Sequence, residues 1–198
     1  MTTGALSPEL LIYAYSTGVF PMAEHRKDAR VMWIEPKWRG IIPLDGFHVS
    51  HSLRRVIRKN IFDVRVDTAF RDVMLNCADR EETWINDQIL DSYCGLFDLN
   101  LAHSVECWKE DKLVGGLYGV SLGSAFFGES MFSKETNASK VALCALVERL
   151  KAGGYTLLDT QFLTSHLASF GGVEIPREEY LLLLEQALNI KASFQMPD

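Results

Sequence analysis

The sequence predicts an α+β domain built around a mixed β-sheet. Strand-like and helix-like segments alternate along the 198 residues, two strand-like segments flank a short charged turn, and a strand–helix–strand unit follows them. Such crossovers nearly always join parallel strands, whereas hairpins join antiparallel ones. With 47% apolar residues the chain can bury a substantial core. We expect a small N-terminal α/β layer, residues 1–60, beside a main domain, residues 61–198.

The first helix is marked by residues that start and stop helices. Ser7-Pro8 places proline at the favoured first position, and Gly18 provides the stop after Tyr15. Further along, prolines interrupt regular structure. The elements expected in this layer are a helix at 8–15, an extended bend at 19–22, a strand at 31–34, irregular chain around Pro36 and Pro43, and a helix at 50–60.

The main domain carries the alternating elements of the sheet. Apolar residues between Phe70 and Cys77 recur at helical spacing, which predicts a helix with one buried face. Gly115, Gly116 and Gly119 inside a strand predict a bend or the close approach of another backbone. The expected strands are 62–66, 102–108, 113–122, 125–132 and 156–161, and the expected helices are 67–78, 87–99, a segment between Asn137 and Gly153, 165–170 and 176–190.

Polar residues interrupt the two strands of the strand–helix–strand unit. Alternation puts Glu129 on one face with Phe127 and Met131, and Asp159 on one face with Gln161. If the strands are neighbours, the carboxylates and the amide meet near their carboxyl ends. A carboxylate beside an amide suits the attack of an amine on a carbonyl, because one group accepts a proton and the other stabilises an oxyanion. The alternative is that Asp159 caps a turn and Gln161 is merely exposed.

The net charge of −6 conceals a basic segment. Residues 24–60 hold nine Lys and Arg residues against four Asp and Glu residues, whereas residues 61–198 hold eleven against 21. Within the basic segment, helical spacing separates an apolar side from a basic side, which predicts either contact with nucleic-acid phosphates or a solvated helix face. The basic side consists of Arg54, Arg55, Arg58 and Lys59.

The sequence lacks the motifs that are typical of several classes of protein. The four cysteines lie far apart, without paired metal spacing or a preceding signal peptide, which favours a cytoplasmic protein. No apolar run approaches the roughly 20 residues that span a bilayer, so we expect no membrane partner. No serine nucleophile elbow, Walker loop, dinucleotide fingerprint or zinc helix motif occurs. We therefore expect no metal and no cofactor.

Nine short motifs, in order along nearly the whole chain, carry a resemblance to a known family. They are Gly18-Val19-Phe20-Pro21, His48-Val49-Ser50-His51-Ser52-Leu53, Thr83-Trp84-Ile85, Ala102-His103-Ser104-Val105-Glu106, Leu113-Val114-Gly115-Gly116-Leu117-Tyr118-Gly119, Phe127-Gly128-Glu129-Ser130-Met131-Phe132-Ser133, Asn137-Ala138-Ser139-Lys140, Leu158-Asp159-Thr160-Gln161 and His166-Leu167-Ala168-Ser169-Phe170-Gly171. With these motifs the sequence resembles the leucyl/phenylalanyl-tRNA-protein transferases.

The resemblance implies a GNAT-like fold and an aminoacyltransferase. The expected reaction moves Leu or Phe, and less readily Met, from aminoacyl-tRNA to the N-terminal α-amine of a protein beginning with Arg or Lys, which creates a destabilising N-terminus for regulated proteolysis. The resemblance implies that Glu129, Asp159 and Gln161 lie at the reacting centre. For this reaction we expect the basic helix to meet the phosphates of the tRNA acceptor stem. The residues expected to form the aminoacyl and adenosine pocket are Trp84, Leu117, Phe127, Gly128, Ser130 and Met131.

The chain departs from the family pattern at two places, and two other functions compete. Met22 stands where the family often has Trp, and Ile34-Glu35 replaces the serine of an aromatic-Ser-Pro motif. One rival is a coenzyme-A-dependent N-acetyltransferase, which would need a glycine-containing pyrophosphate loop, but residues 133–140 contain no glycine. The other rival is a tRNA-binding module without catalytic activity.

Overall fold

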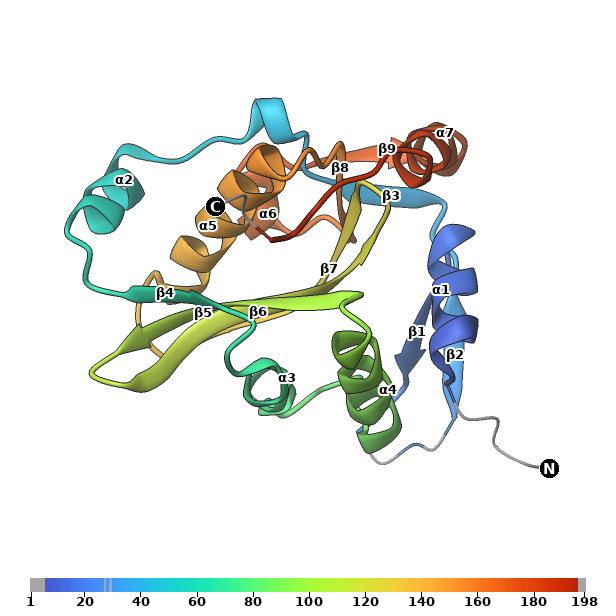
Figure 1. The fold of residues 1–198 in the computed structure, drawn as a ribbon, viewed down its shortest axis with the longest axis horizontal. Coiled ribbons are helices and arrows are strands. Elements are labelled where there is room, and N and C mark those ends of the chain that lie inside the picture. The colour runs from blue at the N-terminus through green and yellow to red at the C-terminus, as the bar shows by residue number, and fades with distance from the viewer. Residues whose placement is uncertain (1–5, 27, 29, 196–198) are drawn as a thin grey trace.

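A computed structural model describes residues 6–26, 28 and 30–195 and places a seven-stranded mixed sheet at the centre of the molecule (Figure 1). The β7–β8 pair is parallel, and the other neighbouring pairs of this sheet are antiparallel. The prediction of an α+β fold with a mixed sheet is confirmed. In spatial order the strands are β4 (Asp63–Val66), β5 (Ala102–Lys109), β6 (Lys112–Leu122), β7 (Ala125–Ser133), β8 (Leu157–Gln161), β3 (Trp38–Ile41) and β9 (Val173–Pro176).

Helices cover both faces of the sheet and bury a separate hydrophobic core on each (Figure 1). The first core lies beneath α1 (Pro8–Ser16), α3 (Phe70–Ala78), α4 (Asp87–Asp98) and α7 (Arg177–Leu188). The second core lies beneath α2 (His51–Arg58), α5 (Ala138–Ala152) and α6 (Ser165–Ala168). A short 3-10 helix spans Leu44–Gly46, and β1 (Phe20–Ala23) pairs with β2 (Val31–Ile34) in a small antiparallel sheet.

The predicted strand–helix–strand unit is present as β7, α5 and β8. Asn137 precedes α5 as expected, but its side chain makes no capping hydrogen bond, because its backbone adopts a left-handed φ of 71°. At the other end, Gly153 terminates the helix. A Cβ atom on Gly115 would lie 2.4 Å from the Cβ of Ala138, so the glycine lets α5 start directly against the sheet.

A β-bulge at Glu129 changes which residues of β7 share a face. Gly119 pairs with Gly128 and Tyr118 pairs with Ser130, which leaves Glu129 as the additional residue. As a result Phe127 belongs to the first core, whereas Met131 packs against the second. The prediction that Phe127, Glu129 and Met131 lie on one face is therefore wrong, since it assumed uninterrupted alternation.

The sequence patterns missed two short strands of the main sheet. β3 pairs with β8 on one side and with β9 on the other. Both strands have four residues and lie close to prolines, so neither shows alternation over a useful length. The boundary at residue 60 stays a prediction, although β3 belongs to the main sheet and α2 contacts α5.

Candidate active site

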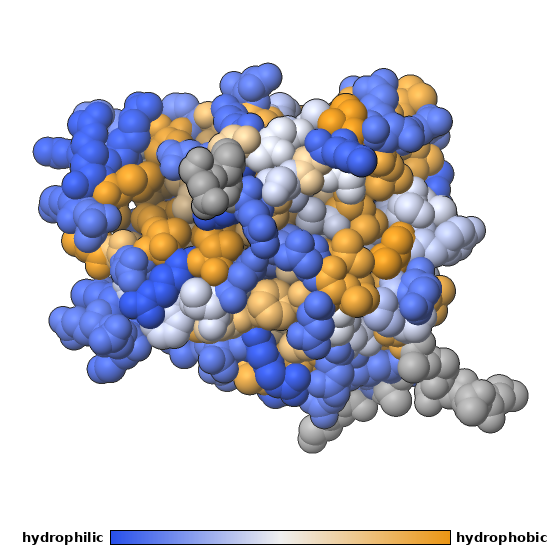
Figure 2. Space-filling model, in the orientation of Figure 1, coloured by the Kyte–Doolittle hydropathy of each residue, from blue (hydrophilic) through white to orange (hydrophobic). Residues whose placement is uncertain are grey.

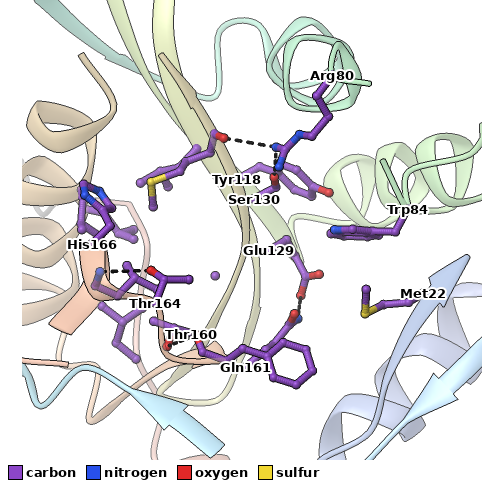
Figure 3. A pocket seen from close by; sticks show the side chains of 18 residues that line it. Met22, Arg80, Trp84, Tyr118, Glu129, Ser130, Thr160, Gln161, Thr164 and His166 are labelled. Carbon is purple, nitrogen blue, oxygen red and sulfur yellow. Dashed lines mark hydrogen bonds between the residues drawn. The ribbon is translucent and has the colours of Figure 1, made fainter. Parts of the chain in front are cut away.

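A cavity of about 310 Å³ opens where β7 and β8 separate (Figure 3). Their ladder ends with the pair Phe127 and Asp159. Beyond it, the bulge turns Glu129 out of the ladder, and Gln161 ends β8 with a left-handed φ of 64°. The cavity is therefore a consequence of two local departures from regular strand geometry, one on each parallel strand.

The cavity combines an apolar wall beside α5 with a polar centre. The α5 end is apolar and is formed by Leu117, Met131, Leu143, Leu146, Leu158 and Leu167. In Figure 3 Glu129 and Gln161 face each other in the middle, with Trp84 and Met22 beyond them on one side and His166 and Thr164 on the other. An apolar side chain and a reacting polar group can thus occupy adjoining parts of the same cavity.

Most of the residues expected to form the pocket do line this cavity. Those that do are Trp84, Leu117, Gly128, Ser130 and Met131. Phe127 does not: it is completely buried in the first core, where its ring centroid lies 4.9 Å from that of Tyr15. Phe127 precedes the bulge and lies where β7 still pairs with β8, so it is outside the region in which the two strands separate.

Glu129 and Gln161 form a directly hydrogen-bonded pair. Gln161 Nε2 donates to Glu129 Oε1 over 2.9 Å, and the Tyr15 hydroxyl donates to the same oxygen over 2.6 Å. The Tyr93 hydroxyl lies 3.4 Å from Glu129 Oε2 and is also hydrogen-bonded to that of Tyr15. Burial raises the pKa of Glu129 to about 7, while the hydrogen bonds from Tyr15 and Gln161 oppose the shift. A carboxyl group with this pKa can both accept and release a proton near neutral pH.

Asp159 is held by a fully buried network. Arg39 donates from Nε over 2.9 Å and from Nη2 over 2.6 Å, and the Tyr180 hydroxyl donates over 2.7 Å. The backbone N–H of Gln161 donates to Asp159 Oδ1 over 2.7 Å, which fixes the turn that carries the glutamine. Asp159 has no exposed surface. Asp159 thus fixes the backbone that carries Gln161, and its complete burial leaves its carboxylate without contact with the cavity.

Sequence reasoning missed the residues that support these groups. Arg39 is 1% exposed, donates to the carbonyl oxygen of Gly18 and lies between the rings of Phe20 and Tyr180. An arginine within an apolar strand segment was a usable signal, because a buried arginine needs a charged partner. Tyr15 carried no comparable signal, since its helical position fits an ordinary core residue.

The predicted basic helix is present as α2, away from the cavity lining. Ser50 caps it and Leu53 anchors it in the second core. In Figure 2 hydrophilic side chains gather where α2 lies. The four basic residues, Arg54, Arg55, Arg58 and Lys59, are all exposed.

The structure offers no grouping of His, Cys, Asp and Glu side chains suited to a metal ion within residues 6–26, 28 and 30–195. In the same part of the chain, no helix has the length and apolar character needed to cross a membrane.

The fold and the cleft define the class of protein. The mixed sheet, whose parallel strands separate over a cleft lined by a carboxylate and an amide, is consistent with the GNAT-like fold that the resemblance implied. The family model described as "Leucyl/phenylalanyl-tRNA protein transferase" matches residues 41–185. The model of the N-terminal domain of the same family matches residues 4–37. The chain belongs to the leucyl/phenylalanyl-tRNA protein transferase family and is a transferase.

Individual relatives match over nearly the full length. The leucyl/phenylalanyl-tRNA–protein transferase of Ruegeria pomeroyi is 56% identical over 96% of this chain and 90% of its own. Proteins of the same name from Cereibacter sphaeroides and Herpetosiphon aurantiacus are each 56% identical, over 100% and 97% of this chain and 92% and 100% of theirs. Among solved structures, L-PGS from Bacillus licheniformis matches with a TM-score of 0.48 and 12% identity, over 78% of this chain and 66% of that one.

Proposed function

We propose that the protein transfers Leu or Phe, and less readily Met, from aminoacyl-tRNA to the N-terminal α-amine of proteins or peptides that begin with Arg or Lys. The product carries a destabilising N-terminus that marks it for regulated proteolysis in the cytoplasm. The observation that carries the proposal is the cavity itself, in which an apolar end adjoins the hydrogen-bonded pair Glu129 and Gln161. Relatives that are about 56% identical are named leucyl/phenylalanyl-tRNA–protein transferases, which supports the donor and the transfer to protein.

The apolar end of the cavity suits the side chain of the transferred amino acid. Its walls are aliphatic and sulfur-containing side chains such as Leu117, Met131 and Leu143. A hydrophobic pocket separates side chains of similar size by only a few kcal/mol, which is consistent with the use of Leu, Phe and Met. Trp84 and Met22, at the other end, face the terminal adenosine in this arrangement.

The reaction needs a positioned amine and a group that receives one proton. The amine nitrogen attacks the ester carbonyl carbon, a peptide C–N bond forms, the ester C–O bond breaks, and the ribose hydroxyl of the tRNA leaves with a proton. An α-amine has a pKa of about 8, so a useful fraction is already neutral at pH 7. The ester is activated, so no cofactor is required. Alignment of the reactants then supplies much of the rate.

We assign the proton transfer to Glu129 and the positioning to Gln161. Glu129 lies in the cavity lining with a pKa of about 7, so its ionised form can take the proton from the attacking amine. Gln161 lies beside it and can donate to the carbonyl oxygen as negative charge develops there. Asp159, which has no exposed surface, keeps the Gln161 turn in place.

The basic face of α2 is the proposed contact for the phosphates of the acceptor stem. Arg54, Arg55, Arg58 and Lys59 are exposed, and contacts of this kind add affinity with little base readout. A solvated helix face remains the competing interpretation, and the salt dependence of tRNA binding separates the two.

The decisive experiment measures transfer of labelled leucine from charged tRNA to a peptide that begins with Arg. The control is the same peptide acetylated at its N-terminus. Label on the free peptide alone supports transfer to the α-amine. No label on either peptide, with the tRNA bound and intact, supports a tRNA-binding module instead, and transfer of acetyl groups from acetyl-CoA supports the N-acetyltransferase.

A further inference from the structure

Arg80 projects a fixed positive charge toward the cavity. It follows α3 in the segment that leads to Trp84, and both residues line the cavity (Figure 3). Its Nε donates to the carbonyl oxygen of Cys77 over 2.7 Å, and its Nη2 donates to Ser130 Oγ over 2.8 Å. A weaker contact of 3.4 Å joins Nη2 to the carbonyl oxygen of Met131. The guanidinium group is therefore held against β7 although the residue is exposed.

No carboxylate neutralises this charge within the described part of the chain. Arg80 is flanked in sequence by Asp79 and Glu81, yet the ion pairs found among the described residues do not include it. All three acceptors that hold it are neutral. An arginine fixed by neutral acceptors keeps its charge for another anion.

Arg80 is also distinctive among the residues that line the cavity. Within the described lining it is the one Lys or Arg, and the other ionisable side chains are Tyr118, Glu129 and His166. Burial lowers the pKa of His166, which favours the neutral form of its ring. The cavity thus presents its permanent positive charge at one place, beside Ser130 and on the side of Trp84.

We propose that Arg80 binds the phosphate on the 5′ side of the terminal nucleoside of the aminoacyl-tRNA. The inference rests on the proposed function. With the ester at Glu129 and Gln161 and the aminoacyl side chain at the α5 end, the nucleoside extends toward Trp84, and its 5′ phosphate is the nearest anion of the donor. Arg80 lies in that direction, and guanidinium groups pair well with phosphate oxygens. Ser130 is then a positioning residue that holds the guanidinium group in place.

The test compares phenylalanyl-adenosine with phenylalanyl-adenosine 5′-monophosphate as donors to a peptide that begins with Arg. For the wild-type protein we expect kcat/KM to be about ten- to a hundredfold higher for the phosphorylated donor, the range of one hydrogen-bonded charge. In Arg80→Gln the ratio should fall to about one, and in Arg80→Lys it should keep an intermediate value. Arg71→Gln is the matched control, because Arg71 is exposed on α3 and faces Asp91.

Each outcome decides one of the two claims. A wild-type ratio near one, or a high ratio that Arg80→Gln preserves, overturns the assignment of Arg80 while leaving transfer from tRNA intact. Equal losses on both donors in Arg80→Gln also overturn it, because they indicate a structural role or contact with the acceptor. Absence of transfer from charged tRNA itself by the wild-type protein would instead refute the proposed function, and the Arg80 assignment with it.

Discussion

Removing the Tyr15 hydroxyl should raise the pKa of Glu129 and move the pH dependence of transfer. Tyr15 donates to Glu129 Oε1 over 2.6 Å, and this hydrogen bond favours the ionised carboxylate. A hydrogen bond to a charged group contributes about 1.5–3 kcal/mol, and 1.36 kcal/mol corresponds to one pKa unit. The pKa should therefore rise by about one to two units from its value of about 7 in Tyr15→Phe. If ionised Glu129 accepts the proton, activity at pH 7 falls about five- to fiftyfold.

The assay is kcat/KM for transfer to a peptide that begins with Arg, measured from pH 5.5 to 9 with the same charged tRNA. The acceptor amine has the same pKa in every assay, so a shift in the rising limb of the pH profile reports on a group of the protein. Tyr13→Phe is the matched control, because Tyr13 is 68% exposed on the same helix. A loss of activity that is equal at every pH would refute the reasoning, since it would show that Tyr15 acts through packing and not through the carboxylate.

The same geometry bears on thermal stability, on tRNA binding and on the packing of α5. Glu129 has a folded-state pKa of about 7 against an ordinary value of 4.5, so the wild-type protein loses stability as pH rises through this window; Glu129→Gln should melt a few °C higher than wild type at pH 8 but not at pH 4. Charge reversal at Arg54 and Arg58 should weaken tRNA binding and flatten its salt dependence in a titration from 50 to 200 mM salt, and an unchanged slope would remove α2 from the tRNA surface. Gly115→Ala should lower the free energy of unfolding in urea by about 1–3 kcal/mol, because its Cβ would lie 2.4 Å from that of Ala138; an unchanged value would mean that α5 shifts freely.

Local patterns were sufficient to predict most helices and the strand–helix–strand unit. The periodicities of α3 and α5 and the alternation of β8 are long enough to identify these elements. Because β7 and β8 are parallel neighbours, the proximity of Glu129 and Gln161 followed from topology alone. The GNAT-like fold and the family followed from the ordered motifs and not from periodicity.

The remaining features depend on contacts between distant segments. Arg39 and Asp159 are 120 residues apart in sequence, and their pairing requires β3 to lie beside β8. The bulge at Glu129 has no signature in the alternation of β7, yet it decides which face each later residue occupies. Sequence patterns therefore located the candidate site, whereas only the structure revealed that Asp159 is inaccessible and that Glu129 is the carboxylate in the cavity.

Single-turnover transfer by Gln161→Gly, with tRNA affinity measured on the same preparation, tests most directly whether this cleft performs the reaction. Glycine accommodates the φ of 64° while it removes the amide. The control is Gln186→Ala, because Gln186 is exposed on helix α7. Alanine replaces glycine in this control because glycine would destabilise the helix. We predict a loss of about 100-fold or more in the transfer rate, with the Kd for charged tRNA within about threefold of wild type. A transfer rate equal to that of wild type would contradict the account.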